Sequence, residues 1–219
     1  MTLSLIALPV KGRIREASDL VVSLAKLAVG DNRQLFSRPI HSITLIRMPA
    51  SEIASGIASG KLPYGITGLD LMTEACLRYN KLNIELCCHY DLCRASLSLM
   101  IPKMYGNINN VNDLHKLAIS TPLRVVSKYK FIVSRFLRSH GFKSFVIIDS
   151  QLPIELSPFI LRCHAIVDVT TSKSTAQSNF LKVIQTPILL TNLCLFYNPE
   201  HDVSLPIESA FCFPNKFRY

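Results

Sequence analysis

Residues 162–180, RCHAIVDVTTSKSTAQSNF, place a row of hydroxyl side chains where a strand pattern gives way to a helix pattern. Backbone N–H groups and hydroxyls that converge on a helix N-terminus are suited to binding a phosphate monoester. Serine and threonine are also good helix N-caps, so an ordinary capped helix remains the alternative. The residues concerned are Asp168 in the strand, followed by Thr170, Thr171, Ser172, Ser174 and Thr175.

Two further turns carry residues that suit an anionic ligand. In PVKGR, Lys11 and Arg13 flank a glycine at the mouth of the first expected helix, whose exposed N–H groups attract anions. In GITG, Gly65 and Gly68 flank Thr67, and glycine permits positive φ and a close approach of ligand to backbone. Solvated loop charges and a plain tight turn are the alternatives, so neither turn defines a site by itself.

The stretch LCCHYDLC contains the densest group of possible metal ligands, namely Cys87, Cys88, His89 and Cys93. Its spacing matches no usual paired-ligand pattern and it follows a strand-like run, so we expect no metal site there. The chain has seven cysteines and no basic region before its first apolar run, which favours reduced thiols in a cytoplasmic protein. No apolar stretch approaches the roughly 20 residues needed to span a bilayer.

The composition predicts a folded, globular protein with a basic surface. Hydrophobic residues make up 49% and charged residues 18% of 219 residues, which is enough for one large domain or two small ones. The formal charge of +9 suits an anionic partner such as nucleic acid, anionic lipid or a polyphosphate metabolite. The positive charges are scattered without a run of five, which makes nucleic acid the weaker interpretation.

The elements that would position these turns alternate along the chain. Strand patterns lie at residues 3–8, 42–48, 64–68, 83–90, 95–102, 123–127, 144–149, 165–170 and 187–197. Helix patterns lie at residues 11–29, 49–60, 69–79, 128–141, 153–161 and 174–184. Strands that alternate with helices of roughly ten residues predict mainly parallel α/β sheets.

These elements are too numerous for one sheet, so we expect two α/β lobes. The strand pair at residues 83–102 has the character of a crossing between lobes. The first lobe is expected to comprise residues 1–90 and 185–219, and the second residues 91–184 with the phosphate-binding turn. A ligand cleft is expected at the carboxyl ends of the strands.

Four stretches occur in the order and spacing of one known family. ALPVKGR, SEIASGIASGKLPYGITGLDL, RVVSKY and PIELSPFILRCHAIVDVTTSKST resemble ATP phosphoribosyltransferase, the enzyme that opens histidine biosynthesis. The resemblance runs from Leu3 to about Leu195, and the length is similar to the short form, which lacks a C-terminal regulatory domain. It implies a two-lobed, periplasmic-binding-protein-like phosphoribosyltransferase fold. It also implies a homo-oligomer built from dimers and a partner subunit related to histidyl-tRNA synthetase.

The resemblance implies a reaction and a set of roles. N1 of the ATP adenine would join C1 of phosphoribosyl pyrophosphate, with Mg²⁺ bound mainly through the pyrophosphate. The step needs charge neutralisation rather than a strong base, and Lys11 and Arg13 would be the catalytic residues that face the phosphates. The residues implied for phosphoribosyl pyrophosphate are Glu155, Asp168, Thr171, Ser172, Lys173, Ser174 and Thr175. Those implied for the nucleotide are Gly12, Tyr64, Gly65, Thr67, Gly68, Lys128 and Tyr129.

The chain also departs from the family at several positions. Tyr64 stands where an acidic residue is common, Cys163 and His164 replace an alanine–aspartate pair, and Thr171 replaces an acidic residue or serine. Lys173 replaces the glycine of the phosphate turn, where it either obstructs the phosphate or binds it through the ammonium group. We therefore expect an ATP phosphoribosyltransferase. The alternatives are a degenerate relative that binds nucleotide or phosphate without turnover, and a two-lobed solute-binding module.

Overall fold

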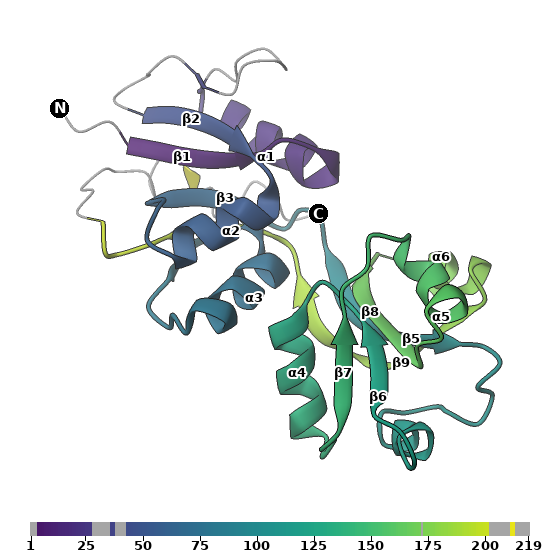
Figure 1. Ribbon diagram of the computed structural model, residues 1–219. Coiled ribbons are helices and arrows are strands. Elements are labelled where there is room, and N and C mark those ends of the chain that lie inside the picture. The colour runs from purple at the N-terminus through teal and green to yellow at the C-terminus, as the bar shows by residue number, and fades with distance from the viewer. Residues whose placement is uncertain (1–3, 28–35, 38–42, 172, 202–210, 213–219) are drawn as a thin grey trace. The chain divides into compact units, whose positions relative to one another are not determined.

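The computed structural model describes residues 4–27, 36–37, 43–171, 173–201 and 211–212, and for residues 4, 173–175, 185 and 186 it describes the backbone alone. The chain divides into two compact units. The first is Met1–Arg94 with Thr191–Tyr219, and the second is Ala95–Leu190. The sequence placed these divisions after residues 90 and 184, a few residues earlier. Each unit contains one sheet with helices packed on it (Figure 1).

The first unit is built on a mixed five-stranded sheet with the order β2-β1-β3-β10-β4. The strands are β1 (Ser4–Pro9), β2 (Ile43–Met48), β3 (Tyr64–Gly68), β4 (Glu85–His89) and β10 (Leu193–Tyr197). β1 runs parallel to β2 and β3, whereas β10 is antiparallel to β3 and β4. Because the carboxyl ends of parallel strands meet at one edge, the turns after β1 and β3 lie at the same edge of this sheet.

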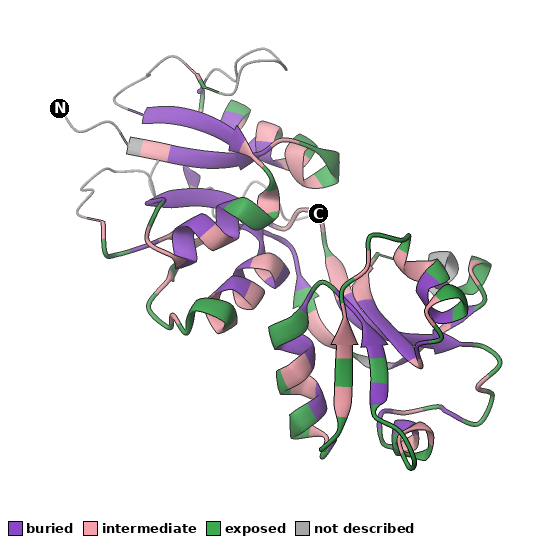
Figure 2. Ribbon diagram, viewed as in Figure 1, coloured by how far each residue is buried: buried purple, intermediate pink, exposed green. Residues whose placement is uncertain are grey.

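Helices cover both faces of the first sheet. They are α1 (Gly12–Leu24), α2 (Ala50–Ala58) and α3 (Leu69–Tyr79). Successive side chains of a strand point to opposite faces. Accordingly Ile6 and Leu8 of β1 pack in one buried cluster with Val21 of α1, and Ala7 packs in another with Ile53 of α2. The inner strands β1 and β3 are therefore largely buried (Figure 2).

The second unit is also built on a mixed sheet, with the order β7-β6-β8-β5-β9. Its strands are β5 (Ala95–Pro102), β6 (Leu123–Val126), β7 (Phe145–Ile148), β8 (Ala165–Thr170) and β9 (Leu181–Thr191). β6 runs parallel to β7 and β8, and β5 is antiparallel to β8. The helical segments are η1 (Asn112–Leu117), α4 (Lys130–Ser139), η2 (Ile154–Leu156), α5 (Ser157–Ile160) and α6 (Lys173–Ser178).

α4 is the longest helix of the second unit and begins two residues after Lys128. Ile132, Val133 and Leu137 recur at helical spacing and are buried, while Arg138 is exposed. This pattern holds α4 against its sheet, next to β7 (Figure 1), while α5 and α6 contact β8. Across the described part of the chain, no helix combines the length and apolar character required to cross a membrane.

The helix expected over residues 174–184 is wrong. α6 ends at Ser178, Phe180 adopts a positive φ of 56°, and residues 181–191 form β9. The polar stretch before Phe180 has no apolar face for a longer helix to bury. Leu181 and Ile184 instead reach 0% and 2% exposure in the strand. The strand expected over residues 187–197 is correspondingly two strands, β9 and β10, separated at Asn192.

Candidate active site

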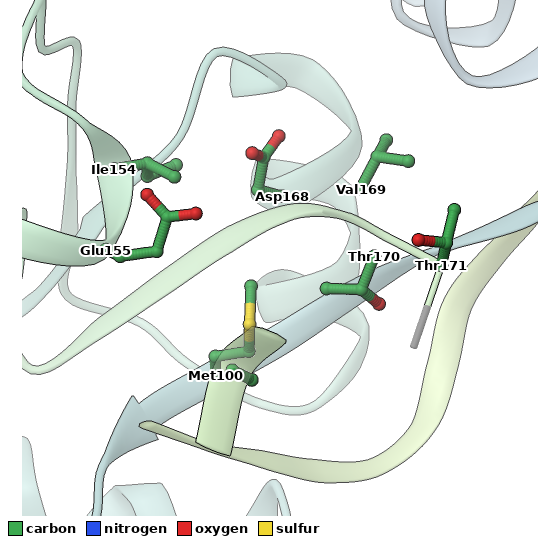
Figure 3. Close-up of a pocket in the computed structure, with 8 residues that line it drawn as sticks. Met100, Ile154, Glu155, Asp168, Val169, Thr170 and Thr171 are labelled. Atoms are coloured by element: carbon green, nitrogen blue, oxygen red, sulfur yellow. The ribbon is translucent and has the colours of Figure 1, made fainter. Parts of the chain in front are cut away.

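A pocket of about 110 Å³ lies at the carboxyl end of β8 within the second unit. Figure 3 shows Glu155 from η2 and Asp168 from β8 with their carboxylates on the same side of the β8 ribbon. Both residues were expected from the sequence to bind one ligand, and the fold brings them to one pocket. The lining residues are Met100, Ile154, Glu155, Asp168, Val169, Thr170, Thr171 and Ala176.

The size and polarity of this pocket limit what it can hold. Pockets for drug-sized ligands usually measure roughly 300–1,000 Å³, so a volume of about 110 Å³ suits a sugar-sized part of a larger ligand. The carboxylates of Glu155 and Asp168 accept hydrogen bonds, which suits hydroxyl groups. A phosphate would meet like charge beside them. The pocket therefore matches a polyhydroxyl group better than a phosphate.

The hydroxyl-rich turn begins at the pocket wall. Thr171 is exposed and lines the pocket, and α6 starts at Lys173. The first N–H groups of a helix have no partner inside the helix, so those of α6 can bind an anion. Ser172 lies outside the described residues, as do the side chains of Lys173, Ser174 and Thr175. The phosphate-binding roles of these four side chains stay predictions.

Lys128 lies beside the pocket residue Asp168, and its nucleotide contact, which the resemblance implied, stays a prediction. Its Nζ is 3.7 Å from Asp168 Oδ1 and 5.0 Å from the centroid of the Tyr129 ring. The Lys128 side chain is 60% exposed, so water screens this wide ion pair and an anionic ligand can compete for the ammonium. Tyr129 itself is only 1% exposed, which makes its ring part of the core.

In the first unit, Lys11, Gly12 and Arg13 follow β1 and are exposed. Lys11 is the N-cap residue of α1, and Gly12 has a φ of +72°, which residues with a side chain rarely adopt. Among the described residues, neither Lys11 nor Arg13 has a salt-bridge partner. Both charges are therefore available to an anionic ligand at the N-terminus of α1.

Side chains from distant parts of the sequence hold the carbonyl groups of this turn. Arg47 Nη1 donates to the Pro9 carbonyl at 3.1 Å, and Arg47 Nη2 donates to Asp19 Oδ1 at 2.6 Å. Cys93 Sγ donates to the Arg13 carbonyl at 3.4 Å, and burial raises the pKa of this thiol. Sequence reasoning missed Arg47, Asp19 and Cys93 because their partners are far away along the chain. An arginine within a buried strand was the available signal.

The residues expected to line a nucleotide wall in β3 are all buried. Tyr64 is 4% exposed and stacks on Tyr197 with ring centroids 4.5 Å apart. Thr67 is fully buried, and its hydroxyl donates to the Ala50 carbonyl at 2.9 Å, which ties β3 to the start of α2. The position where an acidic residue is common is thus filled by a packed aromatic ring. A nucleotide role for Tyr64 and Thr67 stays a prediction.

The two glycines of β3 are required by close packing. A Cβ atom on Gly65 would lie 2.4 Å from Ile53 Cγ2 in α2. A Cβ atom on Gly68 would lie 2.4 Å from Oδ1 of Asp70, the carboxylate that accepts a hydrogen bond from Thr191. Both glycines therefore let α2 and α3 approach the sheet.

The departures at Cys163 and His164 are accommodated locally. His164 Nδ1 accepts the backbone N–H of Arg124 at 2.9 Å, and the His164 N–H donates to the Arg124 carbonyl at 2.8 Å. Burial, with a smaller effect of the nearby Arg124 charge, lowers the pKa of His164. Burial raises the pKa of Cys163 to about 11, so this thiol stays protonated at neutral pH. Neither residue lines the pocket.

The cysteine-rich stretch at the end of β4 makes backbone contacts. Cys212 Sγ donates to the Cys87 carbonyl at 3.2 Å, and Cys88 Sγ contacts the Phe211 carbonyl at 3.7 Å. All seven cysteines are free thiols. Within the described ranges of the chain, no group of three or more His, Cys, Asp or Glu residues is arranged to hold a metal ion.

Comparison with solved structures identifies the fold class. The ATP phosphoribosyltransferase HisG:HisZ complex of Thermotoga maritima matches with a TM-score of 0.70 at 18% identity, covering 90% of this chain and 88% of that chain. The glutamate-bound GluR0 ligand-binding core of Nostoc punctiforme matches with a TM-score of 0.58 at 14% identity, covering 95% and 91%. The fold is therefore the two-lobed, periplasmic-binding-protein-like α/β fold that the sequence predicted.

Comparison of sequences identifies the family. The family model of ATP phosphoribosyltransferase, HisG, matches residues 49–207. The ATP phosphoribosyltransferase of Agrobacterium fabrum is 29% identical over 218 residues, covering 93% of this chain and 94% of that protein. That of Rhizobium etli strain CFN 42 is 29% identical over 203 residues, covering 87% of each. The chain belongs to the ATP phosphoribosyltransferase family, which confirms the resemblance seen in the four sequence stretches.

Proposed function

We propose that this chain is the catalytic subunit of a short-form ATP phosphoribosyltransferase in histidine biosynthesis. It would condense ATP with phosphoribosyl pyrophosphate to give phosphoribosyl-ATP and pyrophosphate. The observation that carries the proposal is the pocket at the end of β8. In a member of this family, this pocket is lined by two carboxylates and by Thr170 and Thr171, shortly before the start of α6.

The chemistry requires a site that stabilises opposite charges. A bond forms between N1 of adenine and C1 of the ribose, while the bond from C1 to the pyrophosphate oxygen breaks and its electron pair leaves with pyrophosphate. Glu155 and Asp168 accept hydrogen bonds from the ribose hydroxyls and offset the positive charge that develops on the ring. Lys11 and Arg13 neutralise the phosphates, which their exposure and lack of described ion-pair partners support.

The 5-phosphate is assigned to the turn beyond the pocket. On this proposal Thr171, which lines the pocket, would donate its hydroxyl to the phosphate, and the first N–H groups of α6 would bind the same anion. Ser172, Ser174 and Thr175 add hydroxyls on this assignment, and Lys173 lies among them. Lys128 contacts the nucleotide. The remaining nucleotide residues act through the shape of the backbone and core that supports the ligand. They are Gly12, Tyr64, Gly65, Thr67, Gly68 and Tyr129.

Magnesium fits this donor set. Mg²⁺ prefers oxygen ligands and is usually held by one or two carboxylates together with substrate phosphates. The ion would be held mainly through the substrate pyrophosphate, and Glu155 and Asp168 are the carboxylates of this pocket that would assist it. The bound ion would supply positive charge next to the leaving group.

The proposed assembly includes a second kind of subunit. A homo-oligomer built from dimers and a catalytically inactive relative of histidyl-tRNA synthetase are the partners we assign to this chain, in the cytoplasm. The structural likeness to the Thermotoga maritima HisG:HisZ complex supports the second partner.

Asp168 gives the most direct test of the proposed site. Asp168→Asn keeps the shape of the side chain but removes the charged acceptor, and hydrogen bonds to charged groups contribute about 1.5–3 kcal/mol. We expect kcat/KM for phosphoribosyl pyrophosphate to fall about ten- to a hundredfold in steady-state assays. Asp149→Asn is the matched control. Asp149 directly follows β7 in the same unit and pairs with Lys130, the first residue of α4, at 3.1 Å, but it does not line the pocket. Equal activity of the two variants would contradict the assignment.

A further inference from the structure

Ser127 lies in the turn between β6 and α4 and is 1% exposed. Its hydroxyl donates to the Val167 carbonyl at 2.7 Å. The same oxygen accepts the backbone N–H of Tyr129 at 3.0 Å. One buried side chain therefore uses its proton and a lone pair to join β8 to the start of α4.

These two hydrogen bonds flank the charged pair beside the pocket. The Val167 carbonyl is part of the peptide bond between Val167 and Asp168. The Tyr129 N–H is part of the peptide bond between Lys128 and Tyr129. β6 and β8 are parallel neighbours, so both peptide groups lie at the same end of the sheet. Ser127 thus fixes the backbone next to both residues of the ion pair, whose charged atoms are 3.7 Å apart.

We propose that Ser127 is a positioning residue for substrate binding, an inference that rests on the proposed function. Ser127 does not line the pocket, whereas Asp168 does, so Ser127 acts through Asp168. By fixing the backbone next to Asp168, it keeps that carboxylate oriented to accept a hydrogen bond from a ribose hydroxyl. It also keeps Lys128 beside that carboxylate. Removing the hydroxyl leaves a buried carbonyl and a buried N–H without their shared partner, and the turn shifts to satisfy them.

Calorimetric binding of phosphoribosyl pyrophosphate to the full chain tests this role. We expect Ser127→Ala to raise the Kd about three- to tenfold, the effect of one neutral hydrogen bond. Ser127→Thr keeps the hydroxyl and should bind within about twofold of the unchanged chain. Ser139→Ala is the matched control, because the Ser139 hydroxyl donates to the Phe136 carbonyl in the last turn of α4. If the alanine variant fails to fold, Ser127→Cys gives the same test, since a thiol is a weak donor and acceptor.

A double-mutant cycle separates positioning from general destabilisation. In an Asp168→Asn background, Ser127→Ala should add less than about a twofold loss, because the group that it positions is already impaired. An equal loss in both backgrounds, or an alanine variant that binds like the Ser139→Ala control, would overturn the role of Ser127. A failure of the unchanged chain to bind phosphoribosyl pyrophosphate would instead contradict the proposed function.

Discussion

His164 stands where the family commonly has an aspartate, and its ring is integrated into the backbone hydrogen bonding of β6. Its Nδ1 can accept the Arg124 N–H only while the imidazole is neutral. The lowered pKa of His164 agrees with this contact, because burial disfavours the charged ring. This departure therefore places a titratable group against the backbone of β6, just before β8, without placing it in the pocket.

Acidification should lower the free energy of unfolding because of this half-buried, neutral histidine. In the unfolded chain His164 takes up a proton near its ordinary pKa of 6.5, whereas the lowered pKa in the folded chain keeps the ring neutral to lower pH. The unfolded state therefore binds more protons, and the free energy of unfolding falls as the pH falls below about 6.5. His164→Asn offers a side-chain carbonyl that accepts the same N–H without titrating. Urea unfolding at pH 7.5 and pH 5 should show a larger loss of unfolding free energy for the unchanged chain than for His164→Asn. Equal losses would contradict the assignment.

The residues expected to contact the ligand could be named from the sequence, whereas those that position them could not. Asp168 and Thr171 stand out in the strand and turn pattern, Glu155 was implied only by the family resemblance, and the fold brings all three to one pocket. Ser127 joins atoms about 40 residues apart in sequence, which no local pattern encodes. The available signal was a serine three residues before the start of a helix, a common site of local side-chain–backbone hydrogen bonds.

Element prediction succeeded where apolar spacing was regular and failed where two patterns competed. The strand patterns that became β1, β3 and β8 were recognisable because buried apolar residues mark them. Residues 174–184 combine a hydroxyl-rich helix start with later apolar residues, and the sequence alone suggested one helix. In the fold, sheet pairing of β9 buries Leu181 and Ile184 and overrides that pattern.

The contact between β3 and α2 depends on Gly65. The added methyl group of Gly65→Ala would overlap Ile53, with a Cβ–Cγ2 distance of 2.4 Å. We expect the free energy of unfolding to fall by about 1–3 kcal/mol, the usual cost of overpacking. Chemical denaturation checks this value, with Gly106→Ala as the control. A Cβ atom there meets nothing within 4 Å, so unchanged or slightly higher stability is expected. Equal stability of both variants would show that α2 has room to move.

The net positive charge of the whole chain is concentrated in the unit that contains the pocket. Residues 95–190 hold eleven of the 24 Lys and Arg residues but only four of the 15 Asp and Glu residues, which gives +7 of the total +9. Such a field favours the approach of polyanionic substrates. Of the anionic partners that the composition allowed, the proposed function favours two polyphosphate substrates.

Product formation by the unchanged chain tests the central claim most directly. The purified chain is incubated with ATP, phosphoribosyl pyrophosphate and Mg²⁺, with and without the subunit related to histidyl-tRNA synthetase, and the nucleotides are resolved by mass spectrometry. We predict a product with the mass of phosphoribosyl-ATP and an equal amount of pyrophosphate, formed only when both substrates are present. Calorimetric binding of both substrates with no product in either mixture would contradict it and would identify a relative that binds without turnover.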